Sequence, residues 1–210
     1  MKLVYPSYDI LFCTDLDLIE ASGRTCYKSD MSNDAKKQQE FIASRIHATH
    51  ESILEHSILS VKFICDRGVS HELVRHRLCA FSQESTRYCN YSGGVTFIIP
   101  PWVDIEPGTY SCPATYVEKT AGIVWLQSML EAEEKYIELL NLNWNPQHAR
   151  SVLPNSLKTE IIVTSNFREW RHILKLRTEK AAHPQMRELM QPLLLELKDI
   201  VPVIFDDIVY

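Results

Sequence analysis

Strand-like and helix-like apolar patterns are mixed along this chain without the regular alternation that a parallel sheet requires. Residues 57–64 alternate apolar and polar side chains, which is typical of a strand with one buried face. Residues 2–12, rich in β-branched and aromatic side chains, and residues 159–165 also predict strands. Because parallel strands need a crossover between each pair, this order favours an α+β fold with a largely antiparallel sheet flanked by helices.

Helical periodicity and capping residues predict the remaining elements. The stretch between residues 90 and 113 carries glycines and prolines too often for a long regular element, so we expect a loop with one short strand at 96–99. Helices are predicted over 16–27, from a Ser32 or Asn33 cap to about 50, over 68–77, over 114–140, from Asn166 onward, and over 184–200.

The length and composition limit the class of protein. A chain of 210 residues with 45% hydrophobic content predicts one domain over residues 1–210. The formal net charge of −5 argues against binding a nucleic-acid polymer. No leader-like or membrane-spanning stretch is recognisable, and the six cysteines form no C-x-x-C pair. We therefore expect a cytoplasmic protein with free thiols.

The densest polar cluster runs from Arg75 to Tyr88, with the sequence RHRLCAFSQESTRY. Its arginines can bind phosphate or carboxylate oxygens in pairs, and its hydroxyl side chains can add donors around the same anion. The alternative is that these arginines pair with acids on a solvated face. The neighbouring aromatic and amide side chains favour a site for a phosphorylated small molecule.

Two near-matches to zinc-protease signatures fail on spacing. A helical zinc pair needs histidines four residues apart, whereas His71 and His76 are five apart and His50 and His56 are six apart. No glycine-rich dinucleotide or phosphate loop is present either. The sequence therefore predicts no metal site.

A second arginine set lies downstream, at Arg150, Arg168, Arg171 and Arg177. Some of these side chains could line one face of a helix beside an apolar wall, which would suit a ligand site. An ordinary amphipathic surface helix would show the same spacing, and the spacing alone leaves both interpretations open.

The residues Arg75, His76 and Arg77, followed after seven residues by Ser85, resemble the R-H-R-x7-S signature of flavin-dependent thymidylate synthases. The segments HESILEH, HARSVLP, TSNFREWRHILKLR and HPQMREL look like further family segments in the expected order. The resemblance covers nearly the whole chain. It implies an α+β subunit of a homotetramer with active sites between subunits, which converts dUMP to dTMP with methylenetetrahydrofolate as carbon donor and NADPH-reduced FAD as hydride source.

The resemblance also implies site residues. The expected FAD contacts are Ser52, Arg75, His76, Arg77, Gln83, Asn166, Arg168 and His172. The expected dUMP contacts are Glu72, Arg75, Gln83, Glu84, Ser85, Thr86, Arg87, Arg150 and Arg177, with Arg177 stabilising the ionised uracil as the catalytic residue. Glu72 stands where many members have glutamine, and Ser82-Gln83 where many have Asn-Glu.

Two rival functions fit parts of the pattern. A small nucleotide- or RNA-binding module would use both arginine sets without chemistry and would carry no flavin. A different flavoprotein, such as a reductase, would bind flavin and show no turnover dependent on dUMP.

Overall fold

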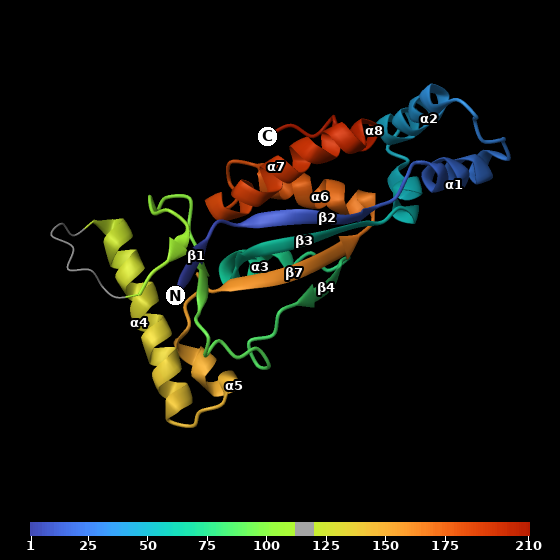
Figure 1. Cartoon of the computed structure of the whole chain (residues 1–210). Helices are drawn as coiled ribbons and strands as arrows, with labels where there is room; N and C mark the ends of the chain where they lie inside the picture. Colours follow the sequence, from blue (N-terminus) through green and yellow to red (C-terminus); the bar gives the residue numbers. More distant parts are fainter. Residues whose placement is uncertain (112–119) are drawn as a thin grey trace. The chain divides into compact units, whose positions relative to one another are not determined.

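The computed structural model describes residues 1–111 and 120–210. Their contacts group into two compact units. The first unit comprises Met1–Ser7, Phe63–Arg75 and Ser82–Ile161, and the second comprises Tyr8–Lys62, His76–Phe81 and Ile162–Tyr210. Figure 1 labels most of the elements, which are β1 (Lys2–Val4), β2 (Ser7–Cys13), α1 (Asp17–Tyr27), α2 (Ala35–His47), η1 (Glu51–His56), β3 (Leu59–Asp66), α3 (Arg67–Leu73), β4 (Ala80–Gln83), β5 (Thr96–Ile98), β6 (Gly108–Thr109), α4 (Ala121–Asn141), α5 (Pro146–Ala149), η2 (Arg150–Val152), β7 (Lys158–Ser165), α6 (Phe167–Thr178), α7 (Pro184–Ile200) and α8 (Pro202–Phe205).

The first unit is built around a small three-stranded sheet of order β5-β1-β6. Strand β1 runs parallel to β5, with Leu3 opposite Phe97, and antiparallel to β6. Both side chains are fully buried, and Leu126 and Tyr136 from α4 join the same apolar cluster. Burial of this apolar face holds α4 in the unit.

The second unit buries one face of α6 and one face of α7. Phe167, Trp170 and Leu174 of α6 are fully buried, as are Met190 and Leu194 of α7. The two helices contact each other along their length, and Figure 1 shows them beside β2. This packing fixes which face of α6 remains available for a site.

A four-stranded sheet has the order β2-β3-β7-β4. Strands β3 and β7 run in opposite directions, since Ser60 faces Thr164 while the Arg67 amide bonds to the Asn155 carbonyl. The α+β class with mostly antiparallel sheets is therefore confirmed. The single domain over residues 1–210 stays a prediction.

Several predicted boundaries were wrong. The predicted strand over 2–12 is two strands in different sheets, because Pro6, between them, has no amide to donate to a ladder. Helix α2 begins after Asp34, whose carboxylate accepts from the Lys36 and Lys37 amides, so neither Ser32 nor Asn33 is the cap. Helix α3 ends at Leu73, before the R-H-R signature.

Other short elements were missed altogether: η1, β4, β6, α5, η2 and α8 have too few residues to show a period. The start of the predicted helix over 114–140 lies partly outside the described residues, and the described helix runs from Ala121 to Asn141. In the parts of the chain that the structure describes, no helix combines the length and apolar character needed to cross a membrane.

Candidate functional site

Helix α6 positions most of the polar side chains of the second unit. Asn166 caps its amino end, where the side-chain oxygen accepts from the Glu169 amide at 2.9 Å. The buried side of the helix is tied down by two further bonds. The Phe167 amide donates to Ser57 Oγ and Trp170 Nε1 donates to the Leu59 carbonyl, each at 2.9 Å. The opposite side faces a pocket.

The pocket has a volume of about 690 Å³, a usual size for a small-molecule site. Three residues predicted to contact FAD lie together in its wall, namely Asn166, Arg168 and His172. Three lining carboxylates were not predicted, Glu51, Glu55 and Glu169: Glu55 accepts a hydrogen bond from Arg168, and Glu51 lies 4.0 Å from the same guanidinium. The remaining lining residues are Leu78, Arg171 and Lys175.

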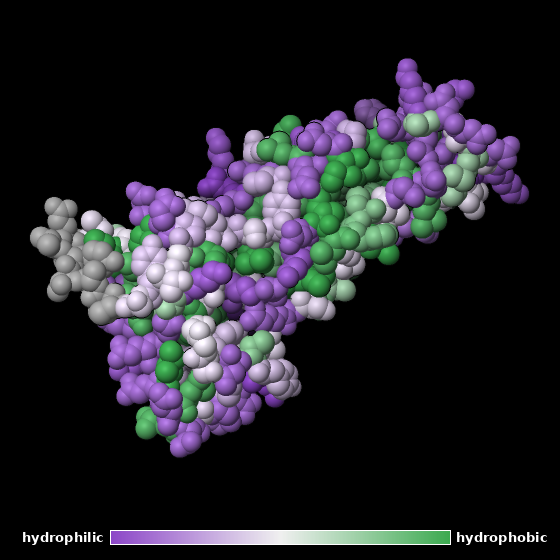
Figure 2. Space-filling model, viewed as in Figure 1, coloured by the Kyte–Doolittle hydropathy of each residue, from purple (hydrophilic) through white to green (hydrophobic). Residues whose placement is uncertain are grey.

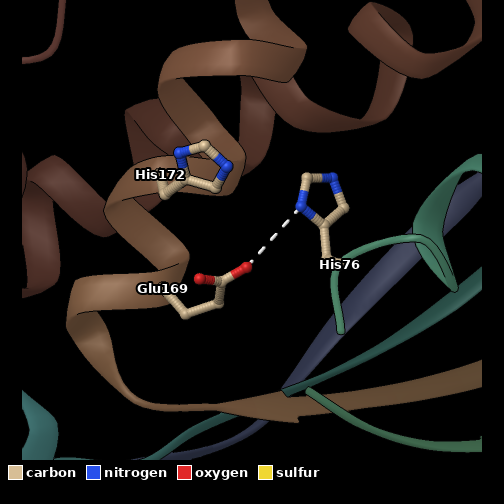
Figure 3. Close-up of side chains that lie close together, drawn as sticks. All are labelled: His76, Glu169 and His172. Atoms are coloured by element: carbon tan, nitrogen blue, oxygen red, sulfur yellow. Dashed lines mark ion pairs between the residues drawn. The ribbon is translucent and has the colours of Figure 1, made fainter. Parts of the chain in front are cut away.

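His76 of the R-H-R signature lies beside α6 in the same unit, as Figure 3 shows. Its Nδ1 is 3.7 Å from Glu169 Oε1, and its Nε2 accepts from Arg177 Nε at 3.1 Å. The His172 ring stands edge-on to it, with 5.9 Å between ring centroids. A signature residue, a predicted flavin residue and the predicted catalytic arginine therefore form one cluster.

Burial first, and then the charges of Arg177 and His172, lower the pKa of His76 to about 4. The imidazole is therefore neutral near pH 7, and its contact with Glu169 is one between a carboxylate and a neutral ring. Burial also raises the pKa of the nearby Cys79 to about 11, so its thiol stays protonated and is a poor nucleophile.

One grouping was missed by the spacing argument. Ligand atoms of His76, Glu169 and His172 all lie within 4.8 Å of one another, and these residue types bind zinc in proteins. The zinc-protease spacing pairs His76 with His71, which lies in α3 and is exposed. Glu169 and His172 lie three residues apart on α6, but His76 comes from a distant part of the chain, so no local spacing could indicate the whole group.

Besides His76, two predicted flavin contacts lie in the second unit outside that pocket wall. Ser52 is exposed in η1, and Arg77 is exposed in the segment between α3 and β4. The other two, Arg75 and Gln83, belong to the first unit.

The residues predicted to contact dUMP belong to the first unit, apart from Arg177. Thr86 is buried, and its hydroxyl accepts from Arg150 at 2.8 Å. The Gln83 amide donates to Ser70 Oγ at 2.9 Å and to Thr159 Oγ1 at 3.2 Å. The structure thus brings Arg150 to the signature segment within one chain.

Glu84 is bound inside the first unit through both carboxylate oxygens. Tyr91 donates to one oxygen at 2.7 Å and Lys158 donates to the other at 3.1 Å. Burial opposes the charge on Lys158, but its hydrogen bonds to Glu160 and Glu84 outweigh burial and raise its pKa. Burial, followed by the bond to Glu84, raises the pKa of Tyr91. Lys158 and Tyr91 were not singled out from the sequence, because neither belongs to a recognisable motif.

The remaining predicted dUMP residues are less enclosed. Ser85 is half-buried, and its hydroxyl accepts from the Arg87 amide at 3.3 Å. Arg75 and Arg87 are exposed, and Glu72 is half-buried in α3. Exposed guanidinium groups and a half-buried hydroxyl are groups suited to binding a phosphate.

Residues 11–203 match the family model described as thymidylate synthase complementing protein. The chain belongs to this family. Relatives named flavin-dependent thymidylate synthase include those of Mycobacterium avium, 31% identical over 95% of this chain and 83% of the relative, and Mycobacteroides abscessus, 33% identical with the same coverage. These matches confirm the enzyme class implied by the R-H-R signature. The chain is a flavin-dependent thymidylate synthase.

Two solved structures share the family fold. The UMP/dUMP methylase PolB from Streptomyces cacaoi, solved with 5-Br dUMP, has a TM-score of 0.78 at 23% identity, over 98% of this chain and 96% of that one. Thymidylate synthase X from Helicobacter pylori, solved with FAD and dUMP, has a TM-score of 0.76 at 24% identity, over 97% and 98%. At 23% and 24% identity, the structural similarity to these two proteins establishes the fold of this chain.

Proposed function

We propose that this chain methylates dUMP to dTMP, with FAD bound mainly by the α6 pocket and dUMP held mainly by the signature segment of the first unit. Methylenetetrahydrofolate would donate the carbon and NADPH would reduce the flavin. The observation that carries the proposal is the meeting of His76, from the signature, with His172 and Arg177 of α6.

The residues of the α6 pocket suit a dinucleotide with ring carbonyls and phosphates. Asn166 uses its side-chain oxygen for the helix cap, which leaves its NH2 group as the part suited to donate to a ligand. Arg168 offers a guanidinium held in place by Glu55, and His172 offers an exposed ring. We propose that these three residues, with Ser52, Arg75, His76, Arg77 and Gln83, hold FAD, which supplies the hydride when it is bound and reduced.

For dUMP, the proposal assigns the phosphate to Arg87, Arg150 and the Ser85 hydroxyl. Arg150 is held by Thr86, so its guanidinium needs little ordering when an anion binds. Glu72, Arg75, Gln83 and Glu84 would complete the nucleotide site. For Glu84 we propose a supporting contribution, since both its oxygens already accept bonds from Tyr91 and Lys158.

Arg177 is proposed to bind the uracil ring and to stabilise its ionised form. A guanidinium supplies fixed positive charge where negative charge develops and exchanges no proton. Its Nε is directed to His76, which holds one edge of the group in a defined orientation.

We further propose a homotetramer with active sites between subunits, in the cytoplasm. Leu11 and Phe12 on the edge strand β2 are about half exposed, as is Ile58, which precedes β3. Figure 2 shows apolar surface over this part of the second unit. Exposed apolar side chains on a strand edge favour a subunit contact. The cysteines of the described residues are free thiols, which suits a reducing compartment.

The test is tritium release from dUMP labelled at carbon 5, with methylenetetrahydrofolate, FAD and NADPH omitted in turn. The proposal predicts release only when all three are present, because carbon 5 loses its hydrogen when the transferred carbon replaces it. A yellow protein that releases no tritium under any condition would contradict it and indicate a different flavin chemistry. A colourless protein that binds dUMP would indicate a nucleotide-binding module.

A further inference from the structure

The hydrogen bond between Arg177 and His76 determines which ring nitrogen of His76 carries the proton. Arginine has donors only, so the Arg177 Nε–H can bond to His76 Nε2 only if that nitrogen has a lone pair. A neutral imidazole has one N–H, which must then be at Nδ1. His76 is 6% exposed, so solvent does little to supply other partners.

The Nδ1–H of this tautomer faces a carboxylate. Glu169 Oε1 is 3.7 Å away, and Figure 3 marks this contact. That distance exceeds a direct hydrogen bond, but a charge acts over it in a partly buried site. The alternative tautomer would turn a lone pair toward the carboxylate and an N–H toward the Arg177 donor. Both of these contacts would be repulsive, so this tautomer is disfavoured.

The groups around His76 also disfavour its protonation. Burial lowers the pKa of His76 most, and Arg177 and His172 on α6 lower it further. An imidazolium would lose the acceptor that Arg177 needs. The neutral ring with its proton on Nδ1 is therefore the only state that supports the contact.

A metal ion is the competing use of this cluster. To bind a metal through the Nδ1 that faces Glu169, His76 would need its proton on Nε2, opposite the Arg177 donor. Metal binding and the Arg177 contact therefore exclude each other, and the ion would also lie near a guanidinium. The electrostatics favour the contact over the metal.

We propose that Glu169 is a positioning residue, which holds His76 in the Nδ1–H tautomer so that Nε2 can orient Arg177. The role assigned to Arg177 comes from the proposed function, and the step added here is the chain from Glu169 through His76 to the guanidinium. Glu169 also lines the α6 pocket, but this scheme assigns it no role in holding the flavin or the substrate.

The test compares Glu169→Ala with Glu169→Gln in the flavin-loaded enzyme. Glutamine keeps the side-chain length and a carbonyl oxygen whose partial negative charge still favours Nδ1–H, so Glu169→Gln should stay within about twofold of wild type in dUMP affinity. Glu169→Ala should weaken dUMP binding about tenfold, or about 1.4 kcal/mol, with FAD affinity within twofold. Glu138→Ala, which removes an exposed carboxylate on α4, is the matched control.

The decisive readout is the tautomer itself, from long-range proton–nitrogen NMR spectra of protein labelled at histidine nitrogens. The His76 signals are assigned by their loss in His76→Asn. Wild type and Glu169→Gln should show an unprotonated Nε2, and Glu169→Ala a mixture. The proposal would be overturned if Glu169→Ala kept both the wild-type tautomer and the wild-type dUMP affinity. It would also be overturned if Glu169→Ala and Glu169→Gln lost equal dUMP affinity and both also bound FAD more weakly.

Two further outcomes separate this proposal from others. If wild type bound no dUMP, the proposed function would fail, while the tautomer measurement would still decide the role of Glu169. If the protein took up Zn²⁺ stoichiometrically and Glu169→Gln abolished that uptake, the cluster would be a metal site and the positioning role would be wrong.

Discussion

Arg177 lies in the last turn of α6, where its Nε donates a hydrogen bond to His76. We expect Arg177→Ala to retain the fold and FAD while kcat/KM for dUMP falls by about 10²–10³, the usual loss when a group that stabilises developing charge is removed. Steady-state kinetics and flavin absorbance check this. Lys180→Ala, an exposed cation near the end of the same helix, is the control.

Activity within a few-fold of wild type in Arg177→Ala would remove this residue from uracil recognition. Loss of the flavin as well would show instead that Arg177 supports the pocket.

The buried neutral imidazole of His76 predicts a loss of stability in acid. Its pKa is lowered to about 4 in the folded protein, whereas an unfolded histidine titrates near 6.5. Between these values the unfolded state binds the extra proton, so the free energy of unfolding falls as the pH drops from 6.5 to 4, by up to about 3 kcal/mol. Urea unfolding across this range should show a smaller fall in His76→Asn, and equal falls in both proteins would be inconsistent with a buried neutral His76.

At the scale of the helix, Asn166 has two separable functions, because its oxygen caps α6 and its amide is proposed to contact FAD. Asn166→Asp keeps the cap acceptor and removes the NH2 donor, so stability should hold while FAD affinity falls. Asn166→Ala should lose both, with about 1 kcal/mol less stability. Urea unfolding and flavin fluorescence titration measure the two effects. Equal FAD affinities in Asn166→Asp and wild type would place the flavin elsewhere.

Long elements were predictable where their period and caps agreed. Helix α7 runs over the predicted residues 184–200, and Asn166 was rightly taken to open α6. Shorter elements failed because a segment such as β4, with four residues, shows no period. The strand over 2–12 failed because the effect of Pro6 on pairing was overlooked.

The site was predictable only in part, and for a physical reason. The signature and the Asn166 to Arg177 segment were recognised by resemblance, and the structure brings His76, His172 and Arg177 together. Glu169 lies inside a recognised segment but was not predicted as a site residue. Its proposed role depends on its contact with His76, which the local sequence does not indicate. Contacts between these segments span about a hundred positions, 101 for the pair of Arg177 and His76, and local spacing contains no information about them.

For the whole molecule, the two compact units divide the predicted sites between them. Six of the eight residues predicted to contact FAD lie in the second unit, and eight of the nine predicted to contact dUMP lie in the first. Flavin affinity and nucleotide affinity should therefore respond to largely different sets of substitutions, with Arg75 and Gln83 shared by both sets.

The proposed tetramer predicts that a charge on the exposed edge strand will lower the oligomeric state. Leu11 on β2 is 50% exposed, and Leu11→Glu should weaken the subunit contact by burying an unpaired carboxylate. Light scattering should show a smaller particle with reduced tritium release. Leu142→Glu, at an exposed leucine after α4, should leave both unchanged. A Leu11→Glu tetramer would place the interface elsewhere.

Hydrogen bonds from Phe167 and Trp170 fasten the buried side of helix α6, while Arg168 and His172 face the pocket from the other. Side chains on the pocket side therefore carry little of the folding energy, and those on the fastened side carry much of it. Ligand preference can then be redesigned at positions 168 and 172 with small losses of stability. A change at 170, by contrast, would turn the helix and displace every pocket-facing group at once, so a library for altered cofactor use should leave that position fixed.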